Sequence, residues 1–135
     1  MNVGVTMYQT SYTKGQELVA QRMARELGKH GHNAFLITGP YHDNRPIQEY
    51  DELRRSGDGY LFFQDSAFKV PLIRVAGYTS MWPPRRIMFQ NFVDVLRRLS
   101  DRFGLDTLIS HSTLWNGPEE ISKFVSWRRM LEQQG

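Results

Sequence analysis

Two polar loops carry the residues of this sequence that are best placed to do chemistry. The first loop, Tyr8 to Lys14, leads into Gly15 and Gln16, and the second runs from His111 to Gly117. Gly15 opens a predicted helix, and backbone N–H groups at the start of a helix can hold an anion. The first loop is therefore a candidate binding site for an anionic group.

The elements that must position the first loop form a strand–helix–strand unit. Asn2–Met7 predicts a short buried strand, and Gly15–His30 predicts an amphipathic helix. Asn33–Thr38 predicts a second strand, whose unbroken apolar run indicates burial on both faces. The unit has about the length that a right-handed crossover between parallel strands needs. It places the Gly15 loop at the carboxyl end of the first strand.

Local patterns predict how the first helix begins and which face it buries. Thr13 and Gln16 have the spacing of a capping box at the helix start. Val19, Met23 and Leu27 recur every four residues, which predicts an apolar face that lies on the sheet.

The middle of the chain contains one short helix and two short strands in this interpretation. Pro46 predicts the first turn of a helix that carries Tyr50 and Leu53 on one side. Tyr60–Phe63 and Val70–Val75 predict two strands that pair as a hairpin.

A long helix, a strand and a last helix complete the predicted order. Pro83-Pro84 starts the helix Arg85–Phe103, Asp106–Ser110 is the next strand, and Pro118 opens the last helix. Alternating strands and helices predict a Rossmann-like, three-layer α/β/α domain with a mostly parallel sheet. We expect one such domain over residues 1–135.

The predicted sheet gives a physical reason to look for the site between the two loops. In an open α/β sheet, ligands bind outside the carboxyl ends of the strands where the strand order reverses. If the strand at Asp106–Ser110 lies beside the first strand, the two loops face each other across that crevice. The first loop has neither the glycine spacing of a dinucleotide-binding fingerprint nor a Walker motif, which disfavours both classes.

Composition excludes several classes of protein. The 135 residues include no cysteine, so disulfides and thiolate metal sites are excluded, and the four histidines lack metal-ligand spacing. No metal site is expected. The net charge of +3 suits anionic ligands or an anionic membrane surface, and it is far from that of a nucleic-acid tail. The sequence has no apolar run near twenty residues, so no membrane span is expected, and its first residues lack the pattern of a signal peptide, so none is expected.

Three short motifs in the first third of the chain match a known family in order. They are Lys14–Glu17 at the helix start, Met23–Leu27 within the helix, and Gly31-His32 before the second strand. Together they resemble the amino-terminal signature of retaining GT-B glycosyltransferases of family four, whose pattern is Gly-Gly-x-Glu, then Leu-Ala-x-x-Leu, then Gly-His. The strand end Asp106–His111 is similar to the histidine-ended strand of that family.

Two positions depart from the family pattern. Lys14 stands in place of the first glycine, which makes the loop stiffer and more basic. Ile109 stands in place of the first histidine of the strand end, which leaves His111 alone. The sequence also lacks the donor-binding carboxyl-terminal domain of such enzymes. The resemblance therefore implies the amino-terminal, acceptor-side fragment of a longer two-domain glycosyltransferase, and it implies that this fragment is inactive by itself.

The resemblance implies a role for residues of both loops. His111 is expected to be catalytic, at the reaction centre, and the alternative is a polar residue that only ends a strand. Lys14, Gly15 and Gln16 are expected to form the donor-phosphate loop. The alternatives are a glycine that only allows helix entry and a solvated lysine. Other side chains of the loops suit a sugar cleft by stacking and hydrogen bonding, with loop packing as the alternative: Tyr8, Tyr12, Ser112, Trp115 and Asn116.

The implied reaction is transfer of a sugar from a nucleotide-sugar donor to an acceptor hydroxyl with retention of configuration, without a metal or another cofactor. The expected acceptor is a sugar or a lipid-linked acceptor, and the expected compartment is the cytoplasm, including a peripheral position at the inner face of the membrane. A stand-alone Rossmann-like ligand-binding module without catalysis is the alternative. Nucleic-acid binding is not expected, because the basic residues do not cluster.

Overall fold

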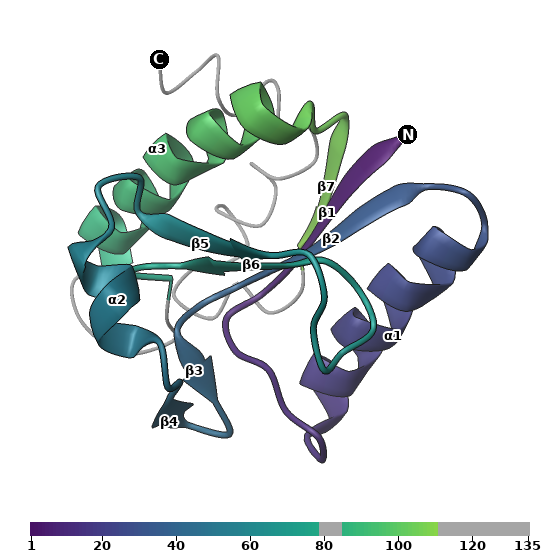
Figure 1. Ribbon diagram of the computed structural model, residues 1–135, viewed down its shortest axis with the longest axis horizontal. Helices are drawn as coiled ribbons and strands as arrows, with labels where there is room; N and C mark the ends of the chain where they lie inside the picture. Colours follow the sequence, from purple (N-terminus) through teal and green to yellow (C-terminus); the bar gives the residue numbers. More distant parts are fainter. Residues whose placement is uncertain (79–84, 111–135) are drawn as a thin grey trace.

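A computed structural model describes residues 1–78 and 85–110 of the chain (Figure 1). The expected last helix from Pro118 lies outside the described residues. The described elements, in chain order, are β1 (Asn2–Met7), α1 (Gly15–Lys29), β2 (Asn33–Thr38), β3 (Tyr41–His42), β4 (Arg45–Pro46), α2 (Tyr50–Arg55), β5 (Tyr60–Phe63), β6 (Leu72–Val75), α3 (Arg85–Phe103) and β7 (Thr107–Ser110).

The main sheet is mostly parallel and has the strand order β5-β6-β2-β1-β7. β1 pairs in parallel with β2 on one side and with β7 on the other, with Val3 opposite Thr107. The prediction that the first strand and the strand near Asp106 are neighbours is confirmed. The predicted hairpin is also confirmed, because β5 pairs antiparallel with β6. Strand order reverses at β1, as the Rossmann-like prediction requires.

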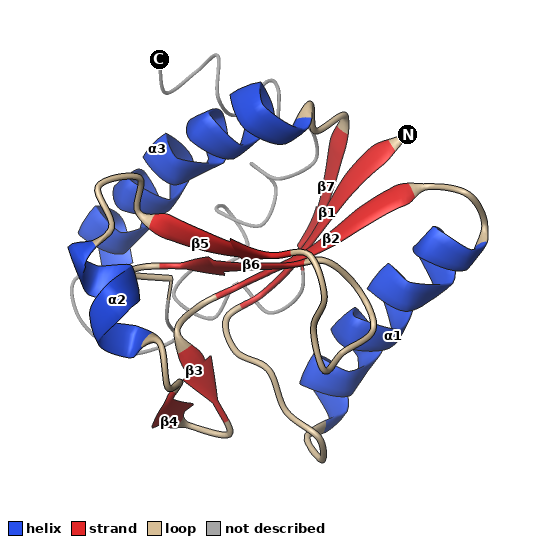
Figure 2. Cartoon of the chain, in the orientation of Figure 1, coloured by secondary structure: helices blue, strands red, loops and turns tan. Residues whose placement is uncertain are grey.

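Helices cover the two faces of this sheet, which gives three layers (Figure 2). On one face, Ala20 and Ala24 of α1 pack against β1 and β2, and both alanines are fully buried. Their small side chains allow the helix to lie close to the strands. On the other face, Leu96 and Leu99 of α3 pack against Ile37 and the neighbouring strands. The chain has a Rossmann-like α/β fold.

The predicted start and face of the first helix are wrong in two details. Lys14 is the N-cap residue and no side chain caps it, so the expected capping box is not formed. The hydroxyl of Ser11 instead accepts hydrogen bonds from the N–H groups of Thr13 and Lys14. Val19 is 51% exposed, because the buried face is rotated toward the polar residues Glu17 and Gln21.

The predicted position of Pro46 is also wrong, because this residue lies in β4 and α2 begins only at Tyr50. Two residues between β3 and β4 explain the difference. Asp43 and Asn44 both adopt positive φ, at 49° and 66°. Two left-handed residues in succession make the tight turn of a two-residue hairpin, and Asp and Asn tolerate that conformation.

In the two described stretches, no helix combines the length and apolar character that spanning a membrane requires.

Candidate functional site

The loop after β1 is fixed by backbone hydrogen bonds to the chain that follows β2. The N–H of Thr10 donates to the carbonyl oxygen of Tyr41 at 3.2 Å, and the N–H of Asp43 donates to that of Thr10 at 3.0 Å. The N–H of Gly39 donates to the carbonyl oxygen of Tyr8 at 3.1 Å. The β3–β4 hairpin therefore holds this loop at the carboxyl edge of the sheet.

A buried cation, Arg74 at the end of β6, joins the same segments. Its guanidinium donates to the carbonyl oxygens of Gly39 at 2.8 Å and Tyr41 at 3.0 Å, and to Oγ1 of Thr10 at 2.9 Å. The residue is 5% exposed. Burial lowers the pKa of Arg74 to about 10, and the charge of Glu49 opposes that shift. The side chain therefore stays charged at neutral pH and orders the loops.

A series of contacts between four polar side chains extends from Arg74 across the loop: Thr10, His42, Asp43 and Ser11. Oγ1 of Thr10 lies 2.8 Å from Nδ1 of His42. The other ring nitrogen of His42, Nε2, lies 3.3 Å from a carboxylate oxygen of Asp43. The hydroxyl of Ser11 donates to the other oxygen of Asp43. The chain of contacts links β6 to the start of α1.

A buried carboxylate lies behind the start of α1. Glu17 is 3% exposed, and its Oε2 accepts a hydrogen bond from Nε2 of Gln9 at 3.0 Å. Its charge lies in the first turn, where a carboxylate is favoured by the positive end of the helix dipole. Burial and the charge of Glu17 raise the pKa of Tyr8, so its hydroxyl remains a hydrogen-bond donor at neutral pH.

The start of α1 is open on its outer side. Gly15 and Gln16 are exposed, Lys14 is half-buried, and no atom lies within 4 Å of the position that a Cβ on Gly15 would take. The first turn of a helix leaves backbone N–H groups without helical partners. The three residues of the expected donor-phosphate loop therefore lie together, with open space beside the glycine.

Tyr12 is the most exposed aromatic side chain of this loop in the described part of the chain. Its ring stacks on Phe68 with a centroid distance of 5.6 Å and meets the edge of His42 at 4.7 Å, yet Tyr12 is 61% exposed. The ring is thus held by its neighbours while much of its surface remains available for a ligand.

The structure brings together only part of the predicted site. Tyr8, Tyr12 and the start of α1 share the carboxyl edge of the sheet. β7 runs parallel to β1 and ends with Ser110 opposite Thr6, so it reaches the same edge. The other predicted residues lie outside the described residues: His111, Ser112, Trp115 and Asn116.

Sequence reasoning missed the polar residues that build the loop. The pair Asp43-Asn44 is a turn sequence that could have indicated the hairpin. Arg74, within an apolar strand, could have been recognised as a buried cation that needs partners. No local pattern identifies the other polar residues of the loop, because they form hydrogen bonds with residues that are distant in the sequence. These residues are Gln9, Thr10, Ser11, Gln21 and His42.

Within residues 1–78 and 85–110, no group of three or more His, Asp or Glu side chains is arranged to hold a metal ion. Metal-independent chemistry remains a prediction from the sequence.

Comparisons with known proteins support the fold. No family model and no curated protein matches the chain. Among solved structures, the chain is similar to sucrose-phosphate synthase from Thermosynechococcus elongatus, with a TM-score of 0.50 and 12% sequence identity. The similarity covers 81% of this chain and 26% of that one, so this chain spans about a quarter of its length. At this level of identity, the likeness supports the α/β fold.

Proposed function

We propose that this chain is the acceptor-side, amino-terminal half of a retaining GT-B glycosyltransferase. One observation carries the proposal: β1 lies between β2 and β7 and is parallel to both, so strand order reverses at β1. In such sheets the crevice outside the carboxyl ends at the reversal is the ligand site. The loop after β1 leads into the first motif that resembles the family, Lys14–Glu17 at the start of α1, and the predicted catalytic His111 directly follows β7 in the sequence.

The start of α1 has the chemistry to contact the donor diphosphate. Backbone N–H groups of its first turn favour an anion. Glu17 opposes anion binding, because its buried negative charge partly cancels the positive potential at the start of α1. The ammonium group of Lys14, one residue before the helix, offsets that charge. We therefore assign Lys14 and the open backbone at Gly15 and Gln16 to the donor phosphates.

The aromatic residues of the loop suit the sugar groups. Tyr12 offers an exposed ring that can stack on the C–H face of a sugar. The hydroxyl of Tyr8 stays protonated at neutral pH and can donate a hydrogen bond to a sugar hydroxyl or a phosphate oxygen. His111, Ser112, Trp115 and Asn116 would complete the cleft from the second loop.

Catalysis in this proposal needs a second domain. The residues of this chain position the acceptor and one side of the donor, while charge that develops on the leaving diphosphate must be stabilised from both sides of the cleft. We therefore expect the 135-residue chain to bind donor weakly and to transfer no sugar.

A stand-alone binding module is the second candidate, and the completeness of the polar network favours it. The buried side chains of Gln9, Thr10 and Arg74 find hydrogen-bond partners within the described chain, so the loop needs no second domain to be ordered. The downstream coding sequence separates the candidates. An open reading frame of roughly twice to three times this length favours the enzyme.

The proposal is tested by titrating the isotope-labelled chain with nucleoside diphosphates and nucleotide sugars and recording amide shifts. We expect the largest changes at Lys14, Gly15 and Gln16, with weak affinity, and no product by mass spectrometry. Gly15→Ala should weaken these changes, because the added methyl group lies in the open space beside the phosphate-binding backbone, and Gly28→Ala, at the far end of α1, should leave them intact. Robust sugar transfer by the chain alone would overturn the two-domain proposal.

A further inference from the structure

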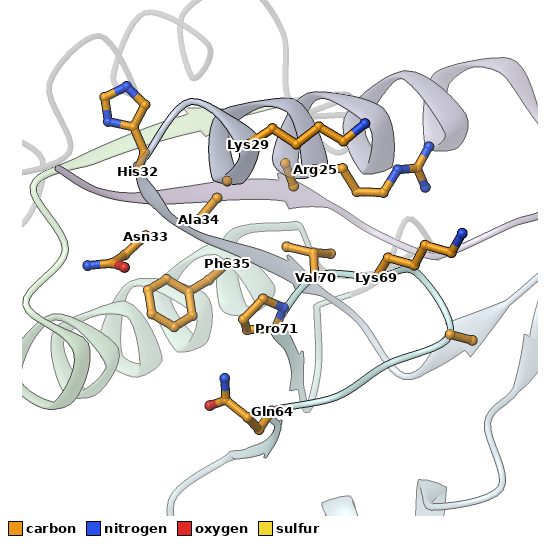
Figure 3. A pocket seen from close by; sticks show the side chains of 13 residues that line it. Arg25, Lys29, His32, Asn33, Ala34, Phe35, Gln64, Lys69, Val70 and Pro71 are labelled. Carbon is orange, nitrogen blue, oxygen red and sulfur yellow. The ribbon is translucent and has the colours of Figure 1, made fainter.

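A groove of about 890 Å³ opens at the edge of the sheet opposite to the candidate site (Figure 3). Its walls are the last turns of α1 and the segment Gln64–Pro71, and its floor includes the first residues of β2. These strand residues, Asn33 to Phe35, lie at the amino end of β2, whereas the loop that holds Gly15 lies at the carboxyl edge. The groove is thus distinct from the site assigned to sugar transfer.

The pairing of β2 explains why the groove exists. β2 pairs with β1 from Asn33 onward, but its pairing with β6 begins only at Leu36. Before that point the chain turns away at Lys69, which has a φ of 60°. Phe68 and Val70 then pack into the core beneath α1. The sheet therefore lacks a strand beside the start of β2, and a hollow remains between α1 and the incoming chain.

The floor of the groove is apolar. It is formed by small or hydrophobic residues from α1, from β2 and from the loop before β6: Ala24, Ala34, Phe35, Val70 and Pro71. Ala24, Ala34 and Val70 belong to the buried core, and Phe35 is half-buried. Phe35 and Pro71 are the floor residues that are only half-buried, so an occupant that covers them would remove further apolar surface from water. Removal of apolar surface from water is the main driving force for protein association.

The rim of the groove is basic. Arg25, Lys29, His32 and Lys69 line it, and no lining residue carries a carboxylate. Lys29 contacts Glu26 at 3.2 Å, but both side chains are more than half exposed, so this pair neutralises little of the rim charge. In Figure 3 the side chains of Arg25, Lys29 and Lys69 extend along the rim, away from Phe35 and Asn33.

We propose that this groove docks an acidic amphipathic helix of a partner protein or partner domain. An apolar floor beside basic side chains complements a helix with one hydrophobic face and carboxylates along its border. A helix is also the element that normally covers such a sheet face in an α/β fold. A small phosphate ligand fits less well, because the cationic groups extend along the rim instead of converging on the floor.

The probe for this proposal is a synthetic 14-residue peptide, labelled with fluorescein, with leucines at helical spacing and glutamates elsewhere. Its binding to the full chain is followed by fluorescence anisotropy. The double variant Lys29→Glu/Lys69→Glu reverses two exposed rim charges, and we expect it to weaken binding about tenfold or more. The matched control Arg54→Glu/Arg55→Glu makes the same charge change on α2, outside the groove, and should alter affinity less than about twofold.

Three results would overturn the proposal. Equal loss in the two double variants would show attraction by net charge alone. Equal binding of a scrambled peptide of the same composition would show that the apolar floor is not used. Lysine-dependent binding to phosphatidylserine vesicles without binding of the peptide would assign the groove to a membrane surface. Circular dichroism of each variant establishes that it is folded, and amide shifts at Ala34 and Val70 would locate the bound peptide.

Discussion

Adding a single methyl group at Gly39 should strongly destabilise the loops that form the candidate site. This residue follows β2 and lies between two backbone segments. A Cβ added there would be 1.6 Å from the carbonyl oxygen of Tyr78 and 2.6 Å from that of Tyr8. Both neighbours are backbone atoms, so no side chain can rotate away. Gly39→Ala must therefore shift the backbone by more than about 1 Å, which is costly in a packed interior.

The loss in the free energy of unfolding can be estimated from the hydrogen bonds that this backbone shift breaks. The N–H of Gly39 donates to Tyr8 at 3.1 Å, and its carbonyl accepts from Arg74 at 2.8 Å. Loss of the neutral bond costs about 1 kcal/mol, and loss of the bond from a charged donor costs about 2 kcal/mol. Overpacking adds about 1–3 kcal/mol. The expected total of about 4–6 kcal/mol is comparable with the stability of a small domain.

Urea denaturation followed by far-UV circular dichroism measures this loss. The matched control is Gly28→Ala, because Gly28 lies within α1 and no atom approaches its added Cβ within 4 Å. Alanine is a better helix former than glycine, so the control should lose no stability. A loss below about 1 kcal/mol for Gly39→Ala, with an unchanged denaturant slope, would refute the close approach on which the loop geometry depends.

Three further predictions concern the site and its surroundings. Burial raises the pKa of Tyr78 above 10.0, so the unfolded chain loses this proton first and stability falls as pH rises beyond 10.0. Tyr78→Phe should make the fall between about pH 9 and 11 shallower in melting experiments, and an unchanged slope would contradict this. Gly15→Ala should leave the melting temperature within about 2 °C, because the space beside it is open, and should weaken nucleotide-sugar binding in the full-length enzyme. His111→Ala in that enzyme should lower kcat by about 10²-fold or more with little change in melting temperature. A large fall in melting temperature with near-normal kcat would mean that His111 only ends a strand.

Much of the fold could be predicted because it depends on local patterns. The long helix has the predicted bounds, Arg85–Phe103, since Pro83-Pro84 precedes it and its apolar residues keep a helical period. The pairing of β1 with β7 joins residues far apart, yet it was predictable because few arrangements satisfy the rules for parallel crossovers.

The polar loop could not be predicted because its contacts are made across long sequence separations. Gln21 looks like a surface residue of the first helix, but it is buried by hydrogen bonds with the backbone of Ser11. These bonds rotate the helix and expose Val19. His42 pairs with Thr10, which lies 32 residues earlier. Helical periodicity predicts that Gln21 faces outward, because its side chain is polar. The backbone groups of Ser11 that form hydrogen bonds with this side chain cannot be identified from the pattern.

The central place of β1 has a consequence for the order in which the protein can fold during synthesis. Among the described strands, β1 is made first and β7, on its outer side, is made last. The hydrogen-bonded residues Asn2, at the start of β1, and Asp106, just before β7, are 104 residues apart. A nascent chain can pair β1 with β2 early, but the other edge of β1 stays unpaired until β7 has left the ribosome. An unpaired strand edge is a template for aggregation. We expect ribosome-bound chains arrested before Thr107 to need a chaperone that shields this edge, and chains arrested well beyond Ser110 to resist proteolysis without one.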